Sequence, residues 1–178
     1  STDLVAVFAG VNDIVAAFER FKAGASYEAA VAEVEAAGET LGAQVNRIAA
    51  AGGKVILTDV PDVSLTAYGQ GQSPDDQTRL HDLTVDFVQR LQVSFTNNGR
   101  LIGYVQLNPY LNAAVNNPSG YGLVNVTEAA CVPLDPLVCT SDTLKPKNGD
   151  VPAATASTWL WATSLQFSPV AHDQLGDL

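Results

Sequence analysis

The sequence predicts an α/β fold in which parallel strands are joined by helices. Three short apolar segments, at residues 3–9, 54–58 and 101–107, have the length and composition of strands. Between them lie longer segments whose apolar residues recur at helical spacing. Because crossovers of this length join parallel strands, we expect helices to cover the faces of one sheet.

The chain is expected to begin with a buried strand at residues 3–9, for which Val5, Val7 and Phe8 supply the apolar bulk. A short helix is predicted next, at residues 14–21, where apolar side chains alternate with a few charged ones.

A long helix is predicted from Ser26, which suits an N-cap, to about Ala51. Gly52 and Gly53 follow it and provide the expected stop. Its predicted buried stripe consists of Ala30, Val34, Ala37, Leu41, Val45 and Ile48.

The second buried strand is predicted at residues 54–58 and stops at a turn, residues 59–62. Residues 68–73 are rich in Gly, Gln and Ser, and we expect them to form a mobile loop. Pro74 then begins a helix, because proline suits the first helical position and two aspartates follow it in the first turn. The predicted buried face of this helix consists of Leu80, Leu83, Phe87, Leu91 and Phe95.

The rest of the chain, after the third strand, is irregular in pattern. The segments predicted there are a helical turn at 111–116, a turn at 118–122, a surface excursion at 131–156, an apolar segment at 159–161 and a short helix at 169–175.

Length and composition indicate one globular domain over residues 1–178, with no internal repeat and no second core evident. The net charge of −10 would repel phosphate backbones, so nucleic acid is not an expected partner. No apolar run approaches the roughly 20 residues that cross a bilayer. The first residues lack the basic and apolar regions of a signal peptide, and the chain opens on a strand as a processed product or a fragment would.

Cys131 and Cys139 flank a proline-containing segment. No histidine lies near them, so a zinc site is not expected, because two thiolates leave the metal half-coordinated. A disulfide is favoured over two free buried thiols, and it would place the protein in the periplasm or outside the cell.

Four segments, in this order, resemble the SGNH (GDSL) ester hydrolases. Residues 10–13 (Gly-Val-Asn-Asp) look like the family's third signature block, and residues 55–62 look like the strand and Pro-Asp turn that follow it. Residues 116–127, with the cysteine pair, resemble its extracellular lipase and esterase branch, and residues 161–172 look like its last block. The resemblance implies a three-layer α/β/α fold with a parallel flavodoxin-like sheet that lacks its first strands.

The resemblance also assigns residue roles. Asn12 would occupy the oxyanion-hole position, and Gly10, Asn12 and Gln166 would line the binding site. The chain has no Gly-Asp-Ser sequence to supply the nucleophile, and Thr163 and Gln166 stand where the family has the aspartate and histidine of its triad. Glutamine cannot serve as a general base near neutral pH, so the catalytic logic of that triad fails.

Other polar residues of the chain are candidates to replace the missing triad groups. A structural role is favoured over catalysis for His172, and a solvated surface position is expected for His81. Ser164 and Ser168 have no visible base. For Asp59 and Asp62, a Pro-Asp turn is favoured over a metal or proton-transfer site. For Asn12, a local hydrogen bond to the loop backbone is favoured over the oxyanion role. For Trp159 and Trp161, core packing is favoured over stacking on a ligand.

Two functions stay open. The first is a non-catalytic relative of the ester hydrolases that binds an ester or lipid-like ligand or assembles with another chain. The strand that ends at Ala9 would then lie on an open sheet edge, and a homodimer or a partner chain would cover residues 4–9. The second is one piece of a secreted carboxylic-ester hydrolase, completed by an upstream segment with the nucleophilic serine. Neither requires a metal or an organic cofactor. A plain flavodoxin-like domain, with a coincidental resemblance, is the third alternative.

Overall fold

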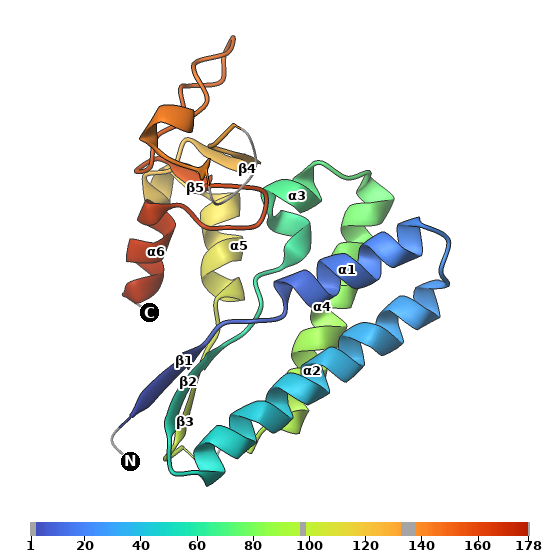
Figure 1. Cartoon of the computed structure of the whole chain (residues 1–178). Helices are drawn as coiled ribbons and strands as arrows, with labels where there is room; N and C mark the ends of the chain where they lie inside the picture. Colours follow the sequence, from blue (N-terminus) through green and yellow to red (C-terminus); the bar gives the residue numbers. More distant parts are fainter. Residues whose placement is uncertain (1–2, 97–98, 133–137, 178) are drawn as a thin grey trace. The chain divides into compact units, whose positions relative to one another are not determined.

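A computed structural model describes residues 3–96, 99–132 and 138–177 (Figure 1). The chain divides into two compact units. The first unit comprises Ser1–Val63 and Thr78–Asn108, and the second comprises Ser64–Gln77 and Pro109–Leu178. The prediction of one domain stays a prediction, because compactness does not test which parts fold alone.

The first unit is built on a parallel three-stranded sheet in the order β1–β2–β3. Its strands are β1 (Leu4–Val7), β2 (Lys54–Thr58) and β3 (Ile102–Val105). The crossovers carry α1 (Val11–Lys22) and α2 (Tyr27–Ala50) after β1, and α4 (Pro74–Ser94) after β2. The predicted α/β class with parallel strands is therefore confirmed.

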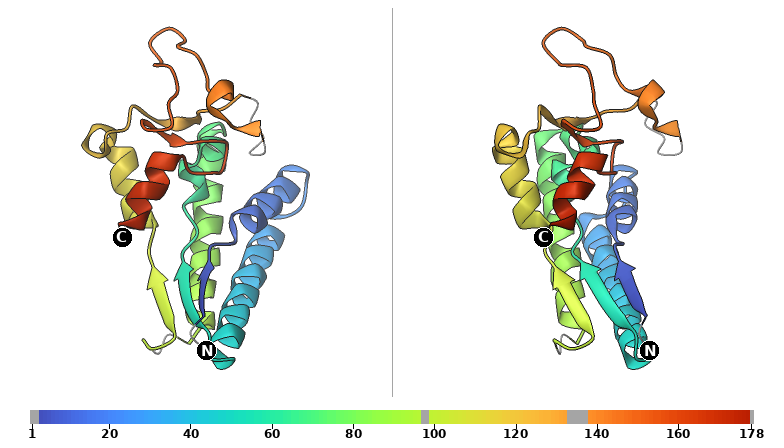
Figure 2. Two further views of the ribbon diagram at one scale, coloured as in Figure 1. Left: turned by 60° about the vertical axis from the view of Figure 1, so that its left-hand side comes forward. Right: turned by 90° about the vertical axis from the view of Figure 1, so that its left-hand side faces the viewer.

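The two faces of this sheet differ in burial. The register aligns Ala6 with Ile56 and Gly103, and all three residues are exposed. Of their neighbours along the strands, Val55, Leu57 and Ile102 are buried, and the helices of this unit lie on one side of the sheet (Figure 2). Since both faces of a parallel sheet are ordinarily covered, this uncovered face is unusual.

The expectation that the first two strands are buried was therefore wrong in part. In β1 the side chain of Leu4 is 62% exposed, and Phe8 just beyond it is 51% exposed. In β2 only alternate residues are buried, and Ile56 is 39% exposed. The apolar composition indicated burial, but a strand with a helix on one side buries only every second side chain.

Helix α2 begins as predicted, with the Ser26 side chain accepting a hydrogen bond from the Ala29 amide. Its buried stripe differs from the prediction at the centre. Ala30, Val34 and Val45 are buried, but Gly38 and Gly42 take the places expected for larger side chains. An added Cβ at Gly38 would lie 2.6 Å from the Phe87 carbonyl oxygen in α4, so glycine allows the two helix backbones to approach closely.

Helix α4 matches the prediction in its start and in its buried face. The Ser73 hydroxyl accepts a hydrogen bond from the Asp76 amide at the first turn. All five residues predicted for the buried face are buried: Leu80, Leu83, Phe87, Leu91 and Phe95. Helical periodicity alone predicted this buried face, because each of its five positions is a leucine or a phenylalanine.

The second unit contains α3 (Ala67–Gln70), α5 (Asn108–Asn116), α6 (Pro169–Gly176) and a two-stranded parallel sheet of β4 (Asn125–Ala129) and β5 (Trp159–Trp161). Short 3₁₀ turns lie at η1 (Val63–Leu65), η2 (Pro118–Tyr121) and η4 (Ser141–Thr143). Its core comprises Tyr110, Leu111, Ala114, Leu123, Val126, Leu160, Trp161, Phe167 and Ala171.

One loop prediction in this unit was wrong. Residues 68–70 belong to the helical turn α3, whose start is capped by the Thr66 hydroxyl accepting from the Gly69 amide at 3.1 Å. The Gly- and Gln-rich composition indicated a loop. The cap and the bond from the Gln70 side chain to the Ser64 carbonyl stabilise the turn instead.

We predict that Gly38→Ala destabilises the chain although alanine is the better helix former. The added methyl group meets a backbone carbonyl that cannot move away, so the cost should be about 2 kcal/mol in the free energy of unfolding, measured by urea denaturation. Ala36→Gly, at an exposed position of the same helix, is the control and should cost about 1 kcal/mol through helix propensity alone. A stabilised Gly38→Ala variant would contradict the close approach.

Candidate functional site

A pocket of about 350 Å³ lies within the second unit, beside the only two cysteines of the chain. Its wall combines residues around η4, the segment that precedes β5 and the loop between β5 and α6. The residues that line it are Ala130, Cys131, Cys139, Thr140, Ser141, Leu144, Thr155, Ala156, Ala162, Thr163, Gln166, Ser168 and Pro169. We call it the disulfide pocket.

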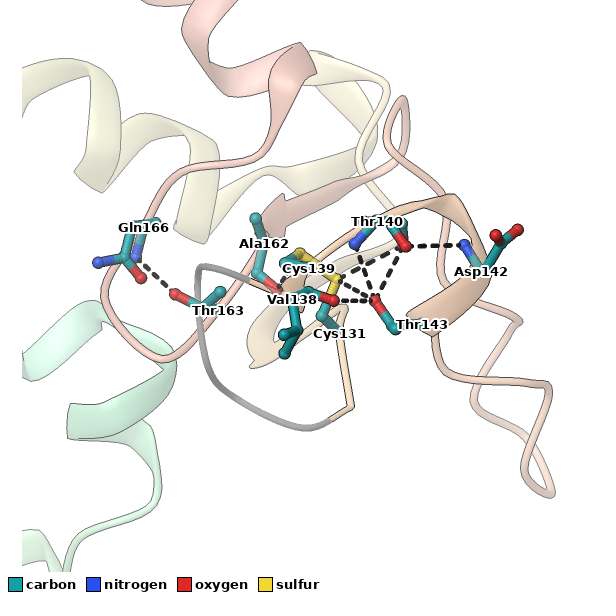
Figure 3. Close-up of a disulfide and its surroundings, with 9 residues drawn as sticks. All are labelled: Cys131, Val138, Cys139, Thr140, Asp142, Thr143, Ala162, Thr163 and Gln166. Atoms are coloured by element: carbon teal, nitrogen blue, oxygen red, sulfur yellow. Dashed lines mark hydrogen bonds between the residues drawn. A yellow bond between two sulfur atoms is a disulfide. The ribbon is translucent and has the colours of Figure 1, made fainter.

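The predicted disulfide is confirmed, since Cys131 and Cys139 are bonded and their Cα atoms lie 5.5 Å apart (Figure 3). Two threonines order the chain just after Cys139. The Thr140 amide donates to the Thr143 hydroxyl at 2.8 Å, and that hydroxyl donates to the Val138 carbonyl at 2.9 Å. The disulfide and these bonds hold one wall of the pocket in place.

Another part of the wall is the turn that contains Ala162, Thr163 and Gln166. Thr163 is fully buried, and its hydroxyl accepts a hydrogen bond from the Gln166 amide at 3.3 Å. The Gln166 carbonyl accepts from the Ala162 amide at 2.8 Å, which closes a tight turn. The Thr163 hydroxyl thus stabilises this turn, and it does so without a charge (Figure 3).

The described lining of the disulfide pocket carries no carboxylate, imidazole or ammonium group. Ser168 is buried and its hydroxyl caps α6 by accepting from the Ala171 amide, so it is not poised as a nucleophile. Proton transfer requires a group that titrates near the working pH, and these residues offer none. The side chains of this described lining are neutral, so the pocket suits a neutral molecule.

Gly10 and Asn12 belong to the first unit, so the structure does not test whether they share a site with Gln166. Gly10 has a φ of 122°, and a Cβ there would lie 2.4 Å from the Phe87 ring. Packing and backbone conformation therefore require glycine at this position. Asn12 is exposed on the first turn of α1, and its proposed oxyanion role stays a prediction.

Polar groups meet at the carboxyl ends of β2 and β3, as the positions of Asp59 and Asp62 had suggested. Asp59 is buried, and its carboxylate accepts from the Leu107 amide at 2.6 Å and from the Asn108 side chain at 3.2 Å. Burial raises the pKa of Asp59 above its ordinary value, although these hydrogen bonds act to lower it. Asn108 also accepts from the Asp62 amide at 2.7 Å and so links the two turns.

The carboxylate of Asp62 contacts His81, whereas the carboxylate of Asp59 contacts Leu107 and Asn108. The His81 Nδ1 atom lies 2.6 Å from the Asp62 carboxylate, while the His81 side chain is 53% exposed. The expected surface position of His81 is thus found, but its ring is oriented by a carboxylate from another element. The sequence analysis did not predict the role of Asn108 at this strand end. The pattern that could have indicated it is a side-chain amide directly after a strand and before Pro109.

The remaining candidate residues have structural positions in the second unit. Trp159 and Trp161 are fully buried in core clusters, and the Trp161 indole donates to the Val126 carbonyl. His172 is exposed on α6, and the centre of its ring lies 6.1 Å from the centre of the Phe167 ring. The Ser164 carbonyl accepts from the Tyr68 amide at 2.9 Å. The two tryptophans therefore pack in the core, which is the role that the sequence favoured.

Within residues 3–96, 99–132 and 138–177, no group of three His, Cys, Asp or Glu side chains could hold a metal ion. None of the helices in the described part of the chain combines the length and apolar composition needed to cross a bilayer. No protein-family model matches the sequence. No curated protein matches it either.

We predict that Asp59 makes stability depend on pH in the direction opposite to that of an ion-paired carboxylate. Because burial raises its folded-state pKa, the folded state binds the proton more readily than the unfolded state. As the pH falls through that raised pKa toward the ordinary value, the free energy of unfolding should therefore rise relative to Asp59→Asn. Urea denaturation of both proteins over this range measures the difference, and a difference that grows as the pH rises would contradict the assignment.

Proposed function

We propose that this chain is a non-catalytic relative of the SGNH ester hydrolases that binds a small neutral, ester-like ligand in the disulfide pocket. The observation that carries the proposal is the pocket's location. It lies at the segment that resembles the catalytic Asp-x-x-His block, and Thr163 and Gln166 in its wall are neutral.

The pocket's volume and lining support a ligand of this class. An apolar cavity of about 150 Å³ holds a benzene ring, so about 350 Å³ accommodates a molecule roughly twice that size. Threonine, serine and glutamine side chains in the wall provide donors and acceptors for a carbonyl group. A free carboxylate or phosphate is disfavoured, because no cation in the described lining would offset its desolvation.

The proposal includes the fold and the compartment that the resemblance implies. The parallel order β1–β2–β3 and the edge position of β1 support a flavodoxin-like sheet without its first strands, whereas the exposed face with Ala6 and Ile56 differs from the three-layer arrangement that the resemblance implies. The disulfide fits secretion or the periplasm, where thiols oxidise. The alternative function, one piece of a hydrolase completed by a segment with the nucleophilic serine, draws its support from the same free edge.

We predict that the chain binds 4-nitrophenyl butyrate without hydrolysing it. No nitrophenolate release should be seen by absorbance, and a fluorophosphonate probe should label no residue. Ala156→Trp should fill the pocket and weaken binding at least about tenfold by NMR titration, which corresponds to about 1.4 kcal/mol. Ala36→Trp, exposed on α2, is the matched control and should bind like the parent.

Two outcomes would contradict this proposal. One is multiple turnover by the chain alone that a single hydroxyl or imidazole substitution abolishes. The other is unchanged binding in Ala156→Trp. Turnover that appears only when a second chain with a Gly-Asp-Ser block is added would favour the alternative function.

We further infer that the free edge of β1 pairs with β1 of a second copy of the chain. Residues 4–10 carry no ionisable side chain, although the net charge of the chain is −10. Two copies therefore meet with least repulsion at this strand. Antiparallel pairing about a two-fold axis would join the two sheets and satisfy the outward backbone groups, and the edge has neither the lysine nor the proline that commonly blocks such pairing.

We predict that Ala6→Pro weakens this dimer. The Asp3 carbonyl accepts from the Lys54 amide, so by alternation the Ala6 amide points away from β2 and toward a partner strand. Proline removes this outward donor without breaking a β1–β2 hydrogen bond. Sedimentation velocity should show a dimer dissociation constant raised at least about tenfold, or about 1.4 kcal/mol, with Ala6→Ser as the control. A parent chain that stays monomeric at high concentration would contradict the inference.

A further inference from the structure

A second cavity in the second unit, of about 480 Å³, lies between α3 and β4 and shares no lining residue with the disulfide pocket. Its walls are formed by residues of α3, by β4 and by the side chains of Lys145 and Ser164. We call it the α3–β4 cavity. The proposed function makes no use of it.

The walls of this cavity are fixed by bonds within the unit. The Tyr68 amide donates to the Ser164 carbonyl at 2.9 Å, and the Gln70 side chain donates to the Ser64 carbonyl at 3.0 Å. The facing wall, β4, is paired with β5. Because these segments are already ordered, a ligand would bind without a large ordering cost.

An ion pair marks one side of the cavity. The Lys145 ammonium lies 3.2 Å from the Glu128 carboxylate, and both side chains are partly buried. The ammonium also lies 6.0 Å from the centre of the Trp159 ring. The pair thus offers strong donors and strong acceptors side by side.

This pairing selects against charged ligands. An anion would have to compete with Glu128 for the ammonium, and a cation would have to compete with Lys145 for the carboxylate. A hydroxyl group avoids this conflict, because it can accept from the ammonium and donate to the carboxylate at the same time. Two adjacent hydroxyls would use both partners without separating them.

The remaining lining suits a ring of modest thickness. Ala67, Gly71 and Ala129 leave space, and the half-buried Tyr68 provides a flat apolar surface with polar groups around it. Gln70 and Thr127 add an amide and a hydroxyl. A sugar ring complements this lining, because it has apolar C–H groups on its faces and polar hydroxyl groups around its edge.

We propose that the α3–β4 cavity binds the pyranose ring of a neutral sugar, with adjacent hydroxyls on Glu128 and Lys145 and the ring packed against Tyr68. The same chemistry would recognise a free monosaccharide or the terminal unit of an oligosaccharide. The ligand stays intact, and no bond is formed or broken.

Titration with methyl β-D-glucopyranoside, followed by ¹H–¹⁵N NMR, tests this site. The amide signals of Tyr68, Gly71 and Glu128 should shift, and Glu128→Gln and Lys145→Met should each raise the dissociation constant about tenfold, as expected for loss of a charge-assisted hydrogen bond. Glu35→Gln is the matched control, because Glu35 pairs with Arg90 at 3.1 Å in the first unit and should not matter for binding. The spectra of the unliganded variants show directly whether each one is folded.

Glycine and inorganic phosphate serve as the charged comparison ligands. The proposal is overturned if either of them shifts the cavity signals and the glucoside does not. It is also overturned if the glucoside shifts no cavity signal up to about 50 mM, or if both folded variants bind as the parent does. Maltotriose separates the two sources of the sugar, since tighter binding than that of the glucoside indicates an oligosaccharide and equal binding indicates a monosaccharide.

Discussion

The carboxylate of Asp59 connects the end of β2 to the segment that follows β3. One oxygen accepts from the Leu107 amide and the other from the Asn108 side chain, which in turn donates to the Val60 carbonyl. A buried carboxylate therefore joins the end of β2 to the segment that follows β3, although burial raises the pKa of this carboxyl group.

The side chains that line the disulfide pocket, among the described residues, are neutral. The turn at Thr163 is closed by a hydroxyl, which can replace a carboxylate as a hydrogen-bond acceptor but cannot stabilise a neighbouring cation. The hydrogen bonds that shape this turn therefore require no charged side chain. In the same unit, the charged pair Glu128–Lys145 lies at the α3–β4 cavity, so the two cavities suit ligands of different polarity.

Sequence patterns predicted the elements wherever one physical signal dominated. The buried face of α4 was predicted because five large apolar residues recur at helical spacing, and the start of α2 because Ser26 can cap it. The patterns failed where a partner from elsewhere in the chain decides the outcome. Gly38 is buried because α4 lies against it, and His81 is oriented because Asp62 lies within hydrogen-bond distance. For the candidate site, the sequence indicated the neutral positions 163 and 166 but not the pocket, whose lining comes from separate segments.

The sequence by itself determined the α/β class, the positions of the main helices and the absence of a Gly-Asp-Ser nucleophile, because local periodicity, capping residues and residue identity are properties of neighbouring positions. Only the tertiary structure decided which face of the sheet is covered, which carboxylate contacts His81 and where the two cavities lie. These features depend on distances between residues far apart in the chain, which no local pattern encodes.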